Sequence, residues 1–198
     1  MTRVFDAAGQ QVPVTVLAAG PCVVLQRKAK GTDGYESLQV GFGAIAERHA
    51  TKALLGRCKA ANTGPLGVIR EFAVEAGDEF KVGDTVTAAI FEKVPYVDVM
   101  GVTKGRGFQG VVRRHSMSGG PMTHGGHSKR RVGSVGCREL PGRIHKGKRM
   151  PGHMGNVRAT QTNLKVVQVR PDDNLVLVRG AVPGATGSVV LIIKAKRK

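Results

Sequence analysis

The sequence has few aromatic residues, no tryptophan, and no cysteine pattern that would indicate a disulfide framework or a zinc site. Aromatic residues make up 4% of its 198 residues, so a buried core must be built from Val, Ile, Leu and Ala. The three cysteines, Cys22, Cys58 and Cys137, lie far apart without a Cys-x-x-Cys pair, which predicts reduced thiols. No apolar run is long enough to span a bilayer, so we expect no membrane partner.

One N-terminal stretch is similar to a secretion signal. Residues 7–26 carry no charge and end near a run that looks like a lipoprotein cleavage site. Pro21, however, occupies a position where such a site needs a small residue. Val12, Val14 and Val16 alternate with other residues as they would in a strand. A strand is the favoured interpretation, and a secreted cationic protein stays an alternative that an unprocessed N-terminus would exclude.

Acidic residues are almost absent from one long segment. Residues 104–158, called the basic segment below, contain 13 Lys and Arg but a single acid, Glu139, and so carry +12 of the formal net charge of +17. The same 55 residues hold five of the six histidines and 13 of the 28 glycines. Such an excess of one sign opposes compaction unless a polyanion neutralises it, and nucleic acid is the most common polyanion.

The rest of the chain has the pattern of short, Val-rich strands separated by Gly, Pro or Asp. The expected strands are Val12–Leu17, Cys22–Arg27, Glu36–Phe42, Gly67–Val74, Thr85–Phe91, Tyr96–Val102, Leu164–Arg170, Leu175–Gly180 and Ser188–Lys194. Ala46–Ala61 is the only expected helix, and a hairpin connection is expected at Pro171–Asn174. Val14, Val16, Val166, Val176 and Leu177 are expected to include core-facing positions.

This pattern predicts a mainly β fold in which a closed β-barrel carries a long inserted, irregular basic loop. Residues 1–103 form the first part of the barrel body, residues 104–158 leave it, and residues 159–198 return as strands that complete it. The basic segment has too little apolar content to offset the entropy of ordering, so we expect it to be largely disordered alone. Phosphate groups would order it, and its glycines would let the backbone approach RNA closely.

Gly105–Gly110 satisfies the G-x-G-x-x-G pattern of dinucleotide-binding loops. That pattern needs a helix immediately afterwards and an acid about 20 residues further on. Val111 to Arg114 lead instead into more glycines, and the next acid is Glu139. A nucleotide-dependent enzyme is therefore the less favoured alternative, which mononucleotide binding by the purified protein would support.

The histidines of the basic segment suggest a second alternative, a metal site. His124 and His127 are close enough in sequence to share a metal ion. No carboxylate lies nearby, and the cationic surroundings oppose a divalent metal. Histidine is planar, can stack and donates hydrogen bonds, so RNA contact is the favoured interpretation. No nucleophile–base pair or paired carboxylates stand out, so we expect no catalytic site, metal or cofactor.

The most specific motif runs from the end of one expected strand into the basic segment. The residues that carry it are Phe91, Asp98, Gly101, Thr103, Gly105, Arg106, Gly107, Gly110 and Arg114. It resembles the signature of the universal large-subunit ribosomal protein three family. Shorter matches extend over nearly the whole chain, among them Pro141–Arg143, Lys146–Met150 and Gly180–Ala185. The spacing is similar to that of the bacterial form.

The resemblance implies a translation-protein-like β-barrel whose loop passes through large-subunit (23S-type) ribosomal RNA towards the peptidyl-transferase centre. It also implies a role in starting subunit assembly, a place in cytoplasmic ribosomes, and contact with ribosomal proteins numbered fourteen and nineteen. Family members usually carry a further strand before the position of Met1, so the first barrel strand is not predicted here. The expected RNA-binding residues are Lys104, Arg106, Arg113, Arg114, His115, His124, His127, Lys129, Arg130, Arg131, Arg138, Arg143, His145, Lys146, Lys148, Arg149, His153 and Arg158.

Overall fold

A computed structural model describes residues 1–74 and 79–196 of the chain. The fold is mainly β and divides into two compact units. Unit 1 comprises Met1–Asp98, Thr162–Ala181 and Ile192–Lys198, and unit 2 comprises Val99–Gln161 and Val182–Leu191. Two strands, β7 (Tyr96–Val102) and β10 (Arg158–Arg170), run from one unit into the other.

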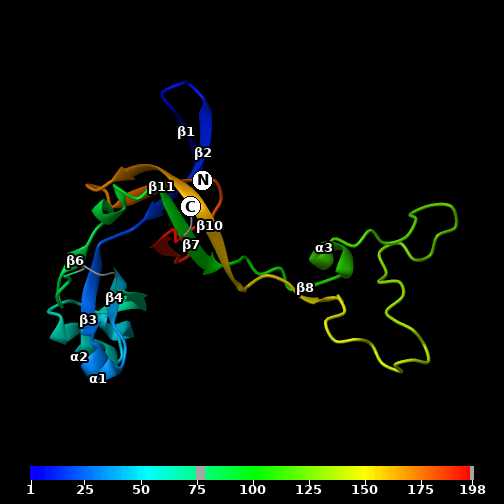
Figure 1. Ribbon diagram of the computed structural model, residues 1–198, viewed down its shortest axis with the longest axis horizontal. Coiled ribbons are helices and arrows are strands. Elements are labelled where there is room, and N and C mark those ends of the chain that lie inside the picture. The colour runs from blue at the N-terminus through cyan, green and yellow to red at the C-terminus, as the bar shows by residue number, and fades with distance from the viewer. Residues whose placement is uncertain (75–78, 197–198) are drawn as a thin grey trace. The chain divides into compact units, whose positions relative to one another are not determined.

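The largest sheet has six strands in the order β1-β2-β11-β10-β7-β12. Its remaining members are β1 (Thr2–Phe5), β2 (Gln11–Ala18), β11 (Leu175–Arg179) and β12 (Leu191–Lys194). The strand β1 was not predicted; it pairs with β2 from Thr2↔Val14 to Phe5↔Gln11, and Figure 1 shows the two as a hairpin. The expected hairpin connection at Pro171–Asn174 is confirmed, because it joins the antiparallel strands β10 and β11.

A four-stranded antiparallel sheet in unit 1 has the order β5-β4-β3-β6. Its strands are β3 (Cys22–Lys28), β4 (Ser37–Ala44), β5 (Leu66–Ala73) and β6 (Thr85–Val86), with the short helix α1 (Lys30–Asp33) between β3 and β4. Strands of the described residues therefore divide between separate open sheets, and the predicted closed barrel does not form. The Val-rich pattern predicted that strands exist, but strand partners depend on long-range pairing that the pattern does not contain.

One helix covers part of the four-stranded sheet. The helix α2 (Lys52–Ala60) begins after Thr51, whose side-chain oxygen accepts a hydrogen bond from the backbone N–H of Leu54 at 3.3 Å. Its buried Cys58 packs with Leu25 of β3 and Leu66 of β5. The predicted helix Ala46–Ala61 was too long, because the 3₁₀ helix η1 (Glu47–His49) precedes α2 and ends before its cap.

Close packing explains one glycine in this core. A side chain on Gly41 of β4 would collide with Leu66 and would approach Cδ1 of Leu25 to 3.1 Å. Glycine is therefore required where the two leucines meet over the strand.

Two predicted strands are wrong over part of their length. The expected strand Thr85–Phe91 is strand only at β6 and continues as the 3₁₀ helix η2 (Ala88–Phe91). Ala88 and Phe91, three residues apart, are both buried, and the N–H of Ala88 donates to Oδ1 of Asn174 at 3.3 Å. The last strand begins at Leu191 instead of Ser188, because Ser188 closes a turn by donating to the carbonyl of Ala185.

Polar side chains form a connected group on the four-stranded sheet. Lys28 Nζ lies 2.8 Å from Oε1 of Glu71. The hydroxyl of Tyr35 accepts a hydrogen bond from Lys28 and donates one to Glu71. The carboxylate of Glu71, followed by the Tyr35 hydroxyl, raises the pKa of Lys28, and hydrogen bonds from Lys28 and Tyr35 lower the pKa of Glu71. The cation of Lys28 in this sheet is thus neutralised by a carboxylate.

Core packing in the six-stranded sheet can be tested on β2, where Val14 is fully buried but Val16 is 43% exposed. The expectation that the five positions include core-facing ones is confirmed, because Val14, Val176 and Leu177 are buried. Val16 is exposed; β1 pairs only with Gln11–Val14, so Val16 has β11 on one side alone. Truncating Val14 to Ala should lower the free energy of unfolding by about 1–4 kcal/mol, and Val16→Ala by much less. Thermal melting of both variants measures this, and equal losses would contradict the difference in burial between the two side chains.

Candidate nucleic-acid interface

The two ends of the basic segment are joined by a ladder of hydrogen bonds within unit 2. The N–H of Thr103 donates to the carbonyl of Val157 at 2.9 Å, and the N–H of Asn156 donates to the carbonyl of Thr103 at 3.1 Å. Further along, the N–H of Arg106 donates to the carbonyl of Met154 at 2.9 Å, and the N–H of Met154 donates to the carbonyl of Gly107 at 3.0 Å. Two residues thus oppose one, as in a β-bulge. The ladder closes the segment into a loop at its base.

The ladder continues as a two-stranded ribbon. The strand β8 (Phe108–Gln109) pairs antiparallel with β9 (Gly152–His153), which places Phe108 opposite His153 and Gln109 opposite Gly152. The sequence did not predict these strands, which are two residues long.

The helix α3 (Val111–His115) follows β8 directly, where no helix was expected from the sequence. Val111 is buried, Arg114 Nη1 donates to the carbonyl of Met150 at 2.7 Å, and His115 Nε2 lies 3.1 Å from the same oxygen. Tertiary contacts therefore support a helix that local propensity does not favour. The preceding strand pairs antiparallel, whereas a dinucleotide site requires a parallel βαβ unit, so α3 does not restore the nucleotide-binding alternative.

Between residues 116 and 149 the chain is irregular and lacks any helix or strand. A few turns are closed by backbone bonds, such as Gly120 N–H to the carbonyl of Lys129 at 2.7 Å. No residue of this stretch is buried. Figure 1 shows it as coil coloured green to yellow beyond α3. It contributes no core of its own.

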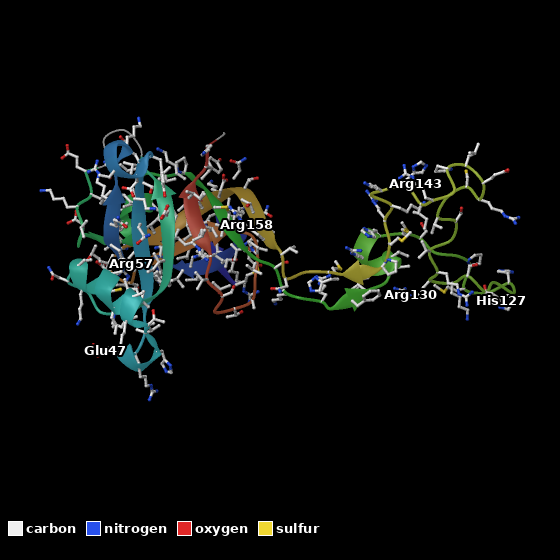
Figure 2. All side chains as sticks on the ribbon, turned by 90° about the horizontal axis from the view of Figure 1, so that it is seen from below. Glu47, Arg57, His127, Arg130, Arg143 and Arg158 are labelled. Atoms are coloured by element: carbon white, nitrogen blue, oxygen red, sulfur yellow. The ribbon has the colours of Figure 1, made fainter. Side chains whose placement is uncertain are left out.

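The structure places the predicted RNA-binding residues almost entirely on the surface. Sixteen of the eighteen are exposed, and only Arg114 and His115 are partly buried through their contacts with Met150. Figure 2 labels His127, Arg130 and Arg143 on the irregular stretch, where their side chains project from the ribbon. Arg158 lies at the start of β10, with Nη2 3.0 Å from Sδ of Met100.

In the part of the chain that the structure describes, none of the 13 cations of the basic segment makes an ion pair. Glu139, the segment's one acid, is exposed and pairs with none of them. The charge of the twelve exposed cations, all but Arg114, is therefore available to an outside anion, in contrast to that of Lys28. Exposed Lys and Arg side chains without ion-pair partners are the groups that neutralise phosphates in protein–nucleic acid complexes.

The histidines do not assemble into a metal centre. Among the described residues, no group of three or more His, Cys, Asp or Glu side chains is placed to hold a metal ion. His124 and His127 are both exposed on the irregular stretch. Across residues 1–74 and 79–196, no helix is long and apolar enough to cross a membrane.

Sequence reasoning overlooked one residue of this surface. Phe108 is 75% exposed although it is the segment's only aromatic residue. That isolation in a cationic stretch was the signal available in the sequence, since a lone aromatic residue has no core to join.

The ladder can be tested at Gly155, which has a φ of +77° and whose Cβ, if present, would collide with the carbonyl oxygen of Lys104. Gly147 is the matched control, because its φ is +82° but nothing lies within 4 Å of its Cβ position. Alanine at either site incurs the left-handed penalty of about 1 kcal/mol, but only Gly155→Ala should also open the ladder. Amide hydrogen exchange at Thr103 and Asn156 should then accelerate; equal exchange in both variants would contradict the close contact.

Comparison with known proteins agrees with the resemblance seen in the sequence. The family model described as Ribosomal protein L3 matches residues 59–174. Large ribosomal subunit protein uL3 of Brachyspira hyodysenteriae is 47% identical over 198 residues, which cover 100% of this chain and 91% of that protein. The protein of the same name from Desulfitobacterium hafniense is 48% identical over 199 residues, covering 99% and 93%. The chain belongs to the ribosomal protein L3 family.

Proposed function

We propose that this chain is a structural constituent of the large ribosomal subunit and binds large-subunit (23S-type) ribosomal RNA through its basic segment. The family is one of structural proteins, not enzymes, and its bacterial members are constituents of cytoplasmic ribosomes. The observation that carries the RNA-binding proposal is the set of 13 cations without an ion pair in the described structure.

Phosphate contacts would supply most of the affinity. Each Lys or Arg that neutralises a phosphate releases condensed counterions, which favours binding at low salt. Arginines such as Arg130, Arg131 and Arg143 can hold two phosphate oxygens with one guanidinium group, while lysines act as point charges. Because these side chains have no competing carboxylate, no internal ion pair must break before RNA binds.

Specificity would come from groups that contact bases and riboses. The exposed rings of His124, His127 and His145 can stack or donate hydrogen bonds to unpaired nucleotides. Irregular backbone suits such a task, since it can follow a folded RNA surface that a helix or sheet would not fit.

The length of the segment supports a role deep within the subunit. An out-and-back path of roughly 27 residues each way reaches at most about 90 Å when fully extended. We propose that it extends towards the peptidyl-transferase centre and that its ordering on RNA helps to nucleate assembly. The proposed protein neighbours are those numbered fourteen and nineteen, and this part is supported by the family resemblance.

A loop deletion separates the proposed roles of the two parts. Replacing residues 118–148 with a short Gly/Ser linker keeps the ribbon of β8 and β9 and the Met150 carbonyl that α3 contacts. Because loop length changes closure entropy only slowly, the melting temperature of the rest of the chain should stay nearly unchanged. The full-length chain should co-sediment with large subunits after a high-salt wash, and the deletion variant should not. Unfolding of the rest of the chain in the deletion variant would contradict the proposal that the loop and the rest of the chain have separate roles. Sedimentation of that variant as complete as that of the full-length chain would contradict it as well.

Charge substitutions test whether the segment itself binds phosphates. Changing Lys146, Lys148 and Arg149 together to Gln should reduce the slope of log affinity against log salt by about 0.7–0.9 for each phosphate that is no longer neutralised. The matched control changes three exposed cations of α2, Lys52, Arg57 and Lys59 (Arg57 is labelled in Figure 2), to Gln. Filter binding to in vitro transcribed large-subunit RNA across a salt series measures both. An equal reduction in the control would show that binding is not localised to the segment.

A further inference from the structure

The ribbon of β8 and β9 has two faces that differ in what covers them. Successive residues of a strand point to opposite faces, so Gln109 and Gly152 share one face while Phe108 and His153 share the other. Both faces belong to unit 2, within the basic segment.

The chain itself covers the first face. A Cβ atom on Gly152 would lie 2.8 Å from Nη1 and 3.3 Å from Cζ of Arg114, so the guanidinium group rests directly on the strand. That group is fixed by its 2.7 Å hydrogen bond to the carbonyl of Met150. Gln109 is tied back as well, because its side-chain amide donates to the carbonyl of Arg106.

The second face is open. Phe108 is 75% exposed, and His153 directly opposite is exposed too. Side chains that face each other across an antiparallel pair have Cβ atoms about 4.5–5.5 Å apart, so the two rings are adjacent. On either side, Cβ positions at Gly107 and Gly110 would meet nothing within 4 Å, which leaves the backbone accessible.

The charge around this face indicates what would cover it. Arg106 directly precedes the strand pair and is exposed. Arg113 of α3 is exposed as well, with Nη1 3.5 Å from Oε1 of Gln109 on the first face. No acid lies between Asp98 and Glu139. An apolar protein surface would have to be placed among unpaired cations. An unpaired nucleobase offers a flat aromatic face for the rings, and its own phosphates offer charges for the arginines.

We propose that Phe108 and His153 form a stacking platform for an unpaired RNA base, held by a phosphate contact from Arg106. The platform deepens the RNA-binding function proposed above and rests on it. The ladder and α3 position the two rings before RNA arrives, so stacking would not have to order this part of the chain. Phe108 is then a base-binding residue in addition to the cations and histidines already named.

The experiment compares two strands of equal charge. The full-length protein is titrated with a short single-stranded oligoadenylate and with an abasic ribose-phosphate strand of the same length. Stacking on one base changes affinity by about 5- to 140-fold, and the wild-type protein should prefer oligoadenylate by that factor. Phe108→Leu should remove most of this preference while binding the abasic strand as the wild type does. Phe5→Leu is the matched control, since Phe5 is a 66% exposed phenylalanine on β1.

A fluorescence readout reports stacking directly. Because the sequence has no tryptophan, Phe108→Trp introduces a single indole whose emission should be quenched by oligoadenylate but not by the abasic strand. Phe5→Trp should show no such difference. His153→Ala should weaken the quenching of the Phe108→Trp variant.

The outcomes separate the platform from general RNA binding. Equal affinity of the wild type for both strands, or equal behaviour of Phe108→Leu and Phe5→Leu, would overturn the platform and leave phosphate binding in place. In that case the face would fit a protein neighbour instead. Failure to bind either strand, at any salt concentration, would overturn the RNA-binding function together with the platform.

Discussion

The imbalance of charge in residues 104–158 determines how that segment can be built. Two cations 10 Å apart in water repel by roughly 0.4 kcal/mol, and 13 of them form many such pairs with only Glu139 to offset them. A compact core in this segment would bring those charges closer together in a lower dielectric. The chain between residues 116 and 149 is instead exposed and irregular, with no buried side chain and no ion pair among the residues described.

Backbone hydrogen bonds and one buried apolar side chain, not ion pairs, stabilise the base of the segment. At its base the backbone groups of Thr103, Asn156 and Val157 pair with one another, and Val111 buries its side chain. One cationic side chain is used as well, because Arg114 donates to the uncharged carbonyl of Met150, which the His115 ring also meets. In the four-stranded sheet, by contrast, the cation of Lys28 is matched by Glu71. The same residue types therefore serve as structural partners in one sheet and as an unneutralised surface in the segment.

Sequence patterns predicted the strands with regular alternation and the division of charge, but not the interactions that connect distant residues. Val-rich runs predicted β2, β3 and β11 nearly to their ends. The 3₁₀ helix η2 was predicted as strand, because its position depends on Asn174, 86 residues away. The ribbon of β8 and β9 was not predicted because two-residue strands have no period, and α3 because its support comes from Met150. That Phe108 lies opposite His153 likewise became clear only from the pairing of the two strands.

The pairing of β2 with β11 imposes an order of events during synthesis. The two strands meet only when the chain is nearly complete, as the 165-residue separation between Thr15 and its bonded partner Gly180 illustrates. At about 5–20 residues per second, β2 waits roughly 8–30 s for that partner. The four-stranded sheet uses one continuous stretch, residues 22–86, so it has no such delay. During synthesis, the whole basic segment is therefore made before β11 is available to pair with β2. Until then, the backbone groups of β2 that bond β11 in the six-stranded sheet lack their partners.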